Sequence, residues 1–350
     1  MSSKTATGRF FEDFQVGDRI VHATPRTLNA GDSSIYSALF GTRFAVQSAD
    51  SFARAVGYPQ SPMDDLLAFH VVFGKTVPDV SLNAVANLGY AQCRFLKAVY
   101  PGDTLSAMSE VIGLKQNSDG RSGVVYVRST GVNQRGETVI DYVRWVMIRK
   151  RDAASPAPTT LVPTLAPIVA IDELGAACPK LNVAEYDLAL AGSPHLWGDY
   201  AKGERIDHVD GVTVEEAEHQ IATRLYQNTA KVHFNQFSEG QGRFGRRLIY
   251  GGHVISLARA LSFNGLGNAF HIAAINGGRH VAPLFAGDTV FAWSEVLDAS
   301  ALPSRDDVGA LRVRLIATKN RSCADFPGKS GDVYDPNVVL DLDLWVLLPR

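Results

Sequence analysis

Apolar and polar positions follow the same course twice along the chain. A strongly apolar stretch occupies residues 63–73 in the first half and residues 254–262 in the second. Apolar residues on most faces of a helix are typical of a buried helix. Runs rich in Val, Tyr, Trp and Leu follow, at 124–129, 139–147, 311–317 and 338–348. Such runs predict antiparallel strands, so each half is expected to be an α+β domain.

A short strand and an amphipathic helix are expected ahead of each apolar helix. The strand is expected around Arg19–His22 in the first half. In the second half, Thr213 and Glu216 have the spacing of a capping box, and Ile221 and Leu225 supply apolar positions after it. A capping box satisfies free N–H groups at a helix start, so this spacing predicts a helix capped by Thr213.

The two halves also align residue by residue. Residues 13–22 match 199–208 at an offset of 186, with Asp, Gly, Arg, Ile and His identical. Residues 100–111 match 285–296 at an offset of 185, with seven of the twelve positions identical. A repeat of this length indicates duplication of a whole domain rather than a short-repeat solenoid.

The match continues to the last strand of each half. Residues 141–146 align with 341–346 at an offset of 200, because the second copy carries an insertion around 327–336. Between the copies, residues 152–196 contain six of the chain's 16 prolines. Proline disfavours helix interiors and central strands, so this segment is the predicted linker, and its apolar patch at 161–171 is expected to pack on the surface. The predicted domains are then 1–151 and 197–350.

Composition narrows the class of protein. The 34 Lys and Arg residues balance 36 Asp and Glu residues, so no positive excess exists to bind nucleic acid or an anionic membrane. Neither a signal-peptide core nor an apolar run of about 18 residues is present. Cys93, Cys178 and Cys323 are far apart and suggest neither a disulfide framework nor a thiolate metal site. A soluble, cytoplasmic protein is expected.

Several repeated segments resemble the MaoC-like (R)-specific enoyl-CoA hydratase family. They are the opener Phe14–Asp18 and the strand entry Pro101–Thr104, which Gly287–Thr289 repeats. The resemblance covers nearly the whole chain and is strongest to the branch that hydrates mesaconyl-CoA. It implies a double hot-dog fold, in which two antiparallel sheets each wrap around a central helix. It also implies a hydro-lyase that adds water reversibly to mesaconyl-CoA to give β-methylmalyl-CoA, with CoA as part of the substrate and no separate cofactor.

The family's catalytic motif is Gly-Asp-x-Asn-Pro-x-His. The second copy has Gln-Asn-Thr-Ala-Lys-Val-His at 227–233, and the corresponding segment of the first copy ends in Gln47. The resemblance therefore implies catalysis by His233 in the second copy, a pocket-forming first copy, and one active site per chain. Asn228 stands where the family has its aspartate, so an Asp–His pair is not carried over.

The residues of the second copy suit this chemistry. Hydration of an unsaturated thioester needs a base for water, an acid for the α-carbon and donors for the developing oxyanion, and the ordinary pKa of histidine lets it serve as both acid and base. The Asn228 amide cannot transfer a proton at neutral pH but can orient water or the thioester. Tyr250–His253 resembles the family's Gly-containing helix start, where free N–H groups meet the positive end of the helix dipole. Gly252, beside Gly251, is the predicted oxyanion donor, although both glycines could also serve close packing alone.

Charged residues near this segment offer further roles. Glu239, Asp64 and Asp65 are alternatives for the missing carboxylate, against the more ordinary interpretation as solvated charges. A basic cluster between His233 and Gly252 can bind the substrate carboxylate or the CoA phosphates by charge-assisted hydrogen bonds. Its members are Lys231, Arg243, Arg246 and Arg247.

Competing interpretations remain at this point. Gly240–Gly245 matches a dinucleotide-binding fingerprint but lacks the preceding strand, so a loop is favoured. The histidines show no metal-ligand spacing. A hot-dog thioesterase, which would release CoA, and a non-catalytic acyl-thioester-binding protein are the alternative functions. The oligomeric state is left open, with a homo-oligomer allowed.

Overall fold

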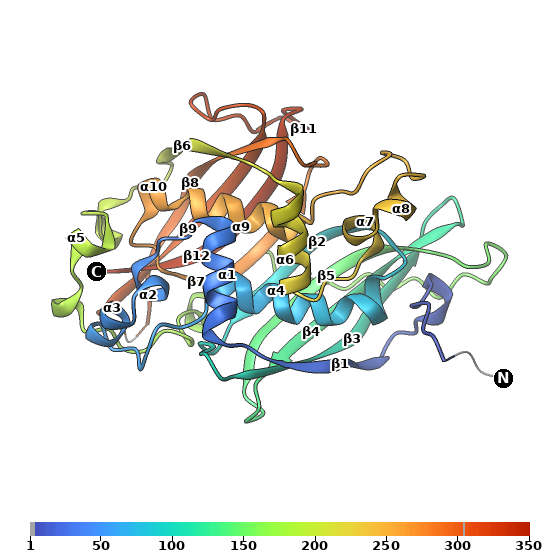
Figure 1. Cartoon of the computed structure of the whole chain (residues 1–350), viewed down its shortest axis with the longest axis horizontal. Coiled ribbons are helices and arrows are strands. Elements are labelled where there is room, and N and C mark those ends of the chain that lie inside the picture. Colours follow the sequence, from blue (N-terminus) through green and yellow to red (C-terminus); the bar gives the residue numbers. More distant parts are fainter. Residues whose placement is uncertain (1–3, 304) are drawn as a thin grey trace.

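The protein is built on one ten-stranded antiparallel sheet (Figure 1). The computed structural model describes residues 4–303 and 305–350, so the first three residues of the N-terminal segment lie outside it. The strand order is β1-β3-β4-β5-β2-β7-β12-β9-β8-β6. The first five strands of this order belong to the first copy and the last five to the second, so the two half-sheets join edge to edge at β2 and β7. No helix in the described parts of the chain is both long and apolar enough to cross a membrane.

The strands confirm those that the sequence predicted and extend them by a few residues. The first copy contains β1 (Arg19–Thr27), β2 (Ala84–Phe95), β3 (Thr104–Gln116), β4 (Ser122–Val132) and β5 (Thr138–Arg149). The second copy contains β6 (Arg205–Thr213), β7 (His271–His280), β8 (Thr289–Ala301), β9 (Val308–Lys319) and β12 (Val338–Pro349). The predicted insertion forms a small hairpin of β10 (Lys329–Ser330) and β11 (Val333–Tyr334).

Both predicted apolar helices are present, and each sheet half wraps around one of them. They are α4 (Asp65–Thr76) and α9 (Gly251–Leu261), which lie on the same face of the sheet (Figure 1). Eleven of the twelve residues of α4 are buried, as the apolar pattern predicted. Two helices on one antiparallel sheet confirm the α+β, double hot-dog fold. The other α-helices are α1 (Ala30–Phe40), α2 (Ala45–Ser48), α3 (Asp50–Ala55), α5 (Leu188–Ala191), α6 (Glu216–Leu225), α7 (Lys231–Phe234), α8 (Gln236–Glu239) and α10 (Phe263–Leu266).

The two central helices share one hydrophobic core. Buried side chains of α4 and α9 belong to the same cluster, which also includes residues of both half-sheets. His70 of α4 and Ser256 of α9 occupy equivalent positions in the two copies, and His70 Nε2 lies 3.0 Å from Ser256 Oγ. The hydroxyl of Tyr36 donates to the same Ser256 oxygen at 2.9 Å. Burial of apolar surface therefore holds the copies together, and a few buried hydrogen bonds fix how they meet.

The predicted capping box at Thr213 is wrong. Thr213 is the last residue of β6, and α6 begins three residues later at Glu216 without a side-chain cap. The Thr213 hydroxyl instead lies 2.8 Å from that of Thr289 on the neighbouring strand β8. The same pair recurs in the first copy between Thr27 and Thr104. The Thr213 side chain therefore bonds to the neighbouring strand instead of capping the helix that the local pattern predicted.

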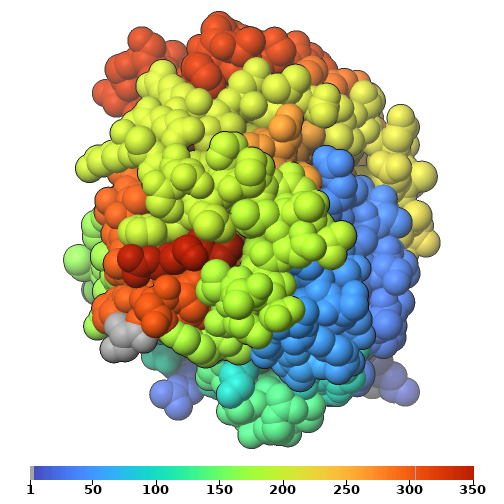
Figure 2. Space-filling view, turned by 90° about the vertical axis from the view of Figure 1, so that its left-hand side faces the viewer, coloured from blue at the N-terminus to red at the C-terminus, as the bar shows by residue number. Residues whose placement is uncertain are grey.

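Part of the linker packs on the molecule, although Val169 is the only buried residue of the apolar patch at 161–171. Figure 2 shows the linker as a yellow-green layer between the blue helices of the first copy and the orange and red strands of the second. Val169, Leu174 and Tyr186 are buried in a cluster that also includes Phe52 of α3 and Trp345 of β12. The Val169 amide donates to Asn276 Oδ1 at 2.8 Å.

One helix–loop contact between the copies leaves no room for a side chain. A Cβ atom on Gly74 of α4 would lie 1.8 Å from the carbonyl oxygen of Tyr226 and 3.3 Å from the amide nitrogen of Asn228. The segment that leads to α7 therefore rests directly on the central helix of the first copy.

We expect Gly74→Ala to destabilise the protein, because the methyl group must push the Tyr226 backbone away. Overpacking of this kind costs about 1–3 kcal/mol, which denaturant unfolding would measure. Gly198→Ala is the matched control, since a Cβ there meets no heavy atom within 4 Å. Equal stability of the two variants would contradict the contact.

Candidate active site

His233 lies on α7, a single helical turn between α6 and α9. The equivalent turn of the first copy is α2, which begins 186 residues earlier and carries Gln47 in the same place. Gln47 Nε2 donates to the Phe270 carbonyl at 2.7 Å, so this position serves packing in the first copy.

The His233 imidazole is held in one tautomer. Its Nδ1 lies 2.9 Å from the carbonyl oxygen of Leu248. A carbonyl oxygen only accepts, so Nδ1 carries the proton and Nε2 keeps its lone pair. Burial lowers the pKa of His233 to about 4, and the hydrogen bond to Leu248 opposes this only in part. At neutral pH the ring is therefore uncharged and Nε2 can accept a proton from water.

Gly251 and Gly252 form the first turn of α9 and leave two backbone donors free. Within the described residues, neither amide N–H has a hydrogen-bond partner. Both glycines are also required by packing, because a Cβ on Gly252 would lie 2.4 Å from His70 Cε1 and one on Gly251 would lie 2.3 Å from His280 Cε1. Glycine therefore satisfies the packing at both positions. The unpaired amides at this helix N-terminus can also stabilise an oxyanion.

Five of the nine histidines gather around this helix start. His219 lies against His233 and His253, with ring centroids 6.2 Å and 5.5 Å apart, and the other two members are His70 and His280. Burial is the main cause that lowers the pKa of all five, to about 3 in His70 and His253 and to about 4 in His233 and His280. No group of three or more His, Cys, Asp or Glu side chains in the described chain is arranged to hold a metal ion.

Sequence reasoning missed this cluster except for His233. Its members come from α4, α6, α7, α9 and β7, so no local spacing relates them. Among these histidines, only His233 lies in the segment that resembles the family's catalytic motif. His253 lies in the segment that resembles the helix start, where the glycines and not the histidine are the predicted site residues.

His219 and Tyr250 fix the chain where it enters α9. The Tyr250 amide donates to His219 Nε2 at 2.9 Å. The Tyr250 ring lies 5.4 Å from the His233 ring and 5.5 Å from that of His70. Tyr250 therefore separates the predicted catalytic histidine from the central helix of the first copy.

Asn228 is buried in the loop before α7. Its Oδ1 accepts the amide of Ala230 at 3.2 Å, so its side chain stabilises the turn that presents His233. Its predicted role in orienting water or the thioester stays a prediction.

The alternative carboxylates make other contacts. Asp64 caps α4 by accepting the Leu66 amide at 2.9 Å, and Asp65 pairs with His271 at 2.9 Å. Burial and the neighbouring Asp65 raise the pKa of Asp64 to about 6. Glu239 of α8 accepts the Ser238 hydroxyl at 3.0 Å. No hydrogen bond joins any of the three to His233 within the described structure.

The predicted basic cluster divides into two sets. Arg243 and Arg246 are exposed and stack on Phe244 and Phe285, at 5.1 Å and 3.9 Å from the ring centroids. Lys231 is exposed as well. Arg247 is different because it is partly buried and pairs with Glu216 at 2.5 Å.

Arg247 also lies near His219 of the histidine cluster. Its positive charge contributes to the lowered pKa of His219. Its Nε is buried and has no hydrogen-bond partner in the described structure. Of the four predicted basic residues, Arg247 therefore offers an unpaired donor near the histidines.

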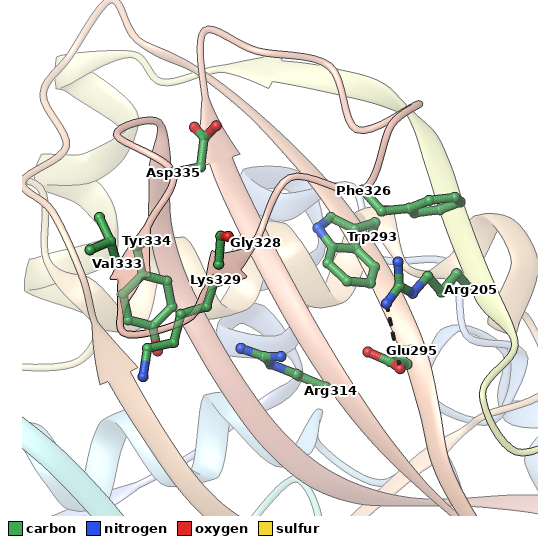
Figure 3. A pocket seen from close by; sticks show the side chains of 11 residues that line it. Arg205, Trp293, Glu295, Arg314, Phe326, Gly328, Lys329, Val333, Tyr334 and Asp335 are labelled. Atoms are coloured by element: carbon green, nitrogen blue, oxygen red, sulfur yellow. Dashed lines mark ion pairs between the residues drawn. The ribbon is translucent and has the colours of Figure 1, made fainter.

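A separate cavity of about 550 Å³ lies under the β10–β11 hairpin (Figure 3). Its lining charges are already paired, with Arg205 3.9 Å from Glu295 and Arg314 2.6 Å from Asp341. None of the sequence-predicted site residues lines it. The sequence-predicted site residues therefore lie outside this cavity.

The histidine cluster predicts acid sensitivity. The folded pKa values lie below the ordinary value of about 6.5, so the unfolded chain binds protons first as the pH falls. The stability that these neutral histidines contribute should be fully present above about pH 6.5. It should fall toward pH 4, by up to about 1.4 kcal/mol per pH unit for each histidine.

Denaturant midpoints at pH 7.5, 6 and 5 would measure this loss of stability. His253→Gln should reduce the slope, whereas His195→Gln, at an exposed position, should not. Midpoints that do not change with pH would contradict the buried, neutral state.

Comparison with known proteins identifies the family. A family model described as mesaconyl-CoA hydratase matches residues 2–162. The chain is 62% identical over 351 residues to the β-methylmalyl-CoA dehydratase of Chloroflexus aurantiacus, covering 100% of this chain and 99% of the relative. It is 61% identical over 349 residues to the mesaconyl-CoA hydratase of Cereibacter sphaeroides, covering 99% and 100%.

Solved structures agree with the fold. A MaoC domain protein from Chloroflexus aurantiacus, 61% identical, superposes with a TM-score of 0.98 and covers 100% of this chain and 99% of that one. A double hot-dog protein from Mycobacterium tuberculosis, 26% identical, gives a TM-score of 0.72 over 99% and 100%. The chain therefore belongs to the mesaconyl-CoA hydratase family of MaoC-like double hot-dog proteins.

Proposed function

We propose that this protein is a hydro-lyase that adds water reversibly to mesaconyl-CoA and gives β-methylmalyl-CoA, without a separate cofactor. Two relatives at 61–62% identity over nearly their full length are named for the two directions of this reaction. The observation that carries the proposal is the neutral His233, with a free Nε2, beside the bare N-terminus of α9.

The reaction follows from these groups. The Gly252 amide, with Gly251 beside it, donates to the thioester oxygen. His233 Nε2 takes a proton from water as the water oxygen bonds to the β-carbon, and the electron pair of the double bond moves toward the α-carbon and the thioester oxygen. His233 then gives the proton to the α-carbon, so one water is added and the histidine returns to its neutral state. Acid–base transfer and oxyanion stabilisation each lower the barrier.

The substrate's free carboxylate needs a cationic partner, and we assign that role to Arg247. Its unpaired Nε and its position near His219 support this assignment. An arginine can hold a carboxylate by parallel, charge-assisted hydrogen bonds. The exposed Lys231, Arg243 and Arg246 are left for the CoA phosphates, which lie outside the reacting region.

The first copy, residues 1–151, forms the pocket wall in this proposal, and the second, residues 197–350, carries the catalytic groups. At the start of α4, Asp64 and Asp65 place carboxylates where α9 has Tyr250 and Gly251. Negative charge there opposes an oxyanion. Together with Gln47, this arrangement favours one active site per chain.

His233→Ala should lower the hydration rate by about 10²–10⁴-fold, because it removes the group that moves the proton. Mass analysis of products from mesaconyl-CoA and crotonyl-CoA would measure this, with Gln47→Ala as the matched control in the first copy. Near-normal hydration by a folded His233→Ala protein would remove the claim. Release of free CoA by the wild type would indicate a thioesterase, and binding without turnover would indicate a non-catalytic protein.

Arg247→Met should raise the KM for mesaconyl-CoA by about 10–100-fold, the cost of losing hydrogen bonds to a charged group. The KM for crotonyl-CoA, which lacks the carboxylate, should change little. Arg246→Ala is the control, because a residue that contacts only the CoA moiety affects both substrates alike. Equal effects of Arg247→Met on the two substrates would count against the assignment.

A further inference from the structure

His280 lies against Gly251 at the N-terminus of α9. It is the last residue of β7, and its ring covers Gly251. A Cβ on Gly251 would lie 2.3 Å from His280 Cε1, 2.4 Å from Nε2 and 2.7 Å from Nδ1. The ring therefore occupies the space directly beside Gly251, the first of the two residues whose amides lack partners.

A tyrosine of the first copy contacts this ring. The Tyr90 hydroxyl lies 3.2 Å from His280 Nε2, and Tyr90 is 3% exposed. Within the described chain the hydroxyl has no other hydrogen-bond partner. A phenol hydroxyl can donate or accept, and when it donates its hydrogen, Nε2 accepts and Nδ1 carries the proton of the neutral ring.

In this tautomer Nδ1–H is a free donor. No described residue accepts a hydrogen bond from it. Burial, with a smaller contribution from His233, lowers the pKa of His280 to about 4, so the ring is neutral at pH 7. Burial raises the pKa of Tyr90 well above its ordinary value, so the phenol keeps its proton.

We propose that His280 is a second catalytic histidine, whose neutral imidazole donates Nδ1–H to the thioester oxygen alongside the amides at the start of α9. This inference rests on the proposed hydratase function and adds a third donor to its oxyanion site. The donor forms a hydrogen bond and transfers no proton, so the proton balance of the reaction is unchanged. Its strength grows as negative charge develops on the oxygen, which is the condition for catalysis rather than binding.

Comparison of the two copies supports a specialised role. Arg94 lies opposite Asp141 in the strand register of the first copy, and Arg279 lies opposite Asp341 in that of the second. The residues that follow these two arginines therefore occupy equivalent positions in the two copies. These residues are Phe95 and His280. The copy without a histidine on its α2 turn thus also lacks this ring donor.

The seam between the half-sheets holds the donor in place. Tyr90 pairs with Gly278 in the ladder between β2 and β7, two residues before His280. The tyrosine and the histidine therefore keep their distance through backbone pairing, and the first copy contributes directly to the active site.

His280→Phe, which restores the residue of the first copy, should lower kcat by about 10²–10³-fold, the usual cost of one oxyanion donor. The KM should change far less. Tyr90→Phe removes only the hydroxyl that contacts His280 Nε2 and should give a smaller loss. His195→Gln, at an exposed position, is the matched histidine control and should keep wild-type kinetics.

A spectroscopic measurement separates this role from a structural one. The probe is the saturated analogue of mesaconyl-CoA, with ¹³C at the thioester carbonyl, bound to each protein. The carbonyl stretch should move to lower frequency on the wild type and on His233→Ala, and this shift should shrink on His280→Phe. If His280→Phe fails to fold, His280→Asn and Tyr90→Phe carry the same measurement.

The outcomes are distinct. An unchanged carbonyl shift and a kcat close to that of the wild type in the folded variants would overturn the role of His280 while the hydratase remains. Absence of hydration by the wild type would overturn the proposed function. A carbonyl shift that still depended on His280 would then support only its contact with the thioester.

Discussion

The close packing of the first copy's central helix against the second copy is the constraint on which the site depends. Gly74 of α4 admits the Tyr226 backbone, and His70 of the same helix fills the space beside Gly252. Where real Cβ atoms would collide, only glycine allows the two surfaces to meet. Packing against α4 therefore determines the positions of the loop that carries His233 and of the helix that carries the free amides. The α4 helix itself contributes no group to the proposed chemistry.

This packing also decides the charge state of the site. Five histidines lie in or beside a shared core, where burial disfavours their charged forms. A cationic histidine cannot act as a base, whereas a neutral one can both accept a proton and donate a hydrogen bond. The same desolvation that makes the fold sensitive to acid gives His233 a free lone pair. Burial of the histidines is thus expected to lower stability in acid and to permit proton transfer at neutral pH.

Duplication gave each copy the same framework and allowed their helix starts to diverge. In the first copy, Asp64 and Asp65 occupy the positive end of α4 and engage the Leu66 amide and His271. In the second, Gly251 and Gly252 leave that end bare. Negative charge at the start of α4 opposes the binding of an oxyanion there. In the proposed division of roles, the first copy has a structural function, because its core and its strand β2 pack against the second copy.

The sequence by itself determined the duplication, the α+β fold and the positions of both central helices, because apolar periodicity and repeated segments are local properties of the chain. It also singled out His233 and the glycines at 251 and 252 through their resemblance to a family pattern. Only the tertiary structure assembled His70, His219, His253 and His280 around them and distinguished Arg247 from its neighbours. It also overruled the local pattern at Thr213. These features depend on contacts between residues far apart in the sequence, which packing of the two copies creates and no local spacing encodes.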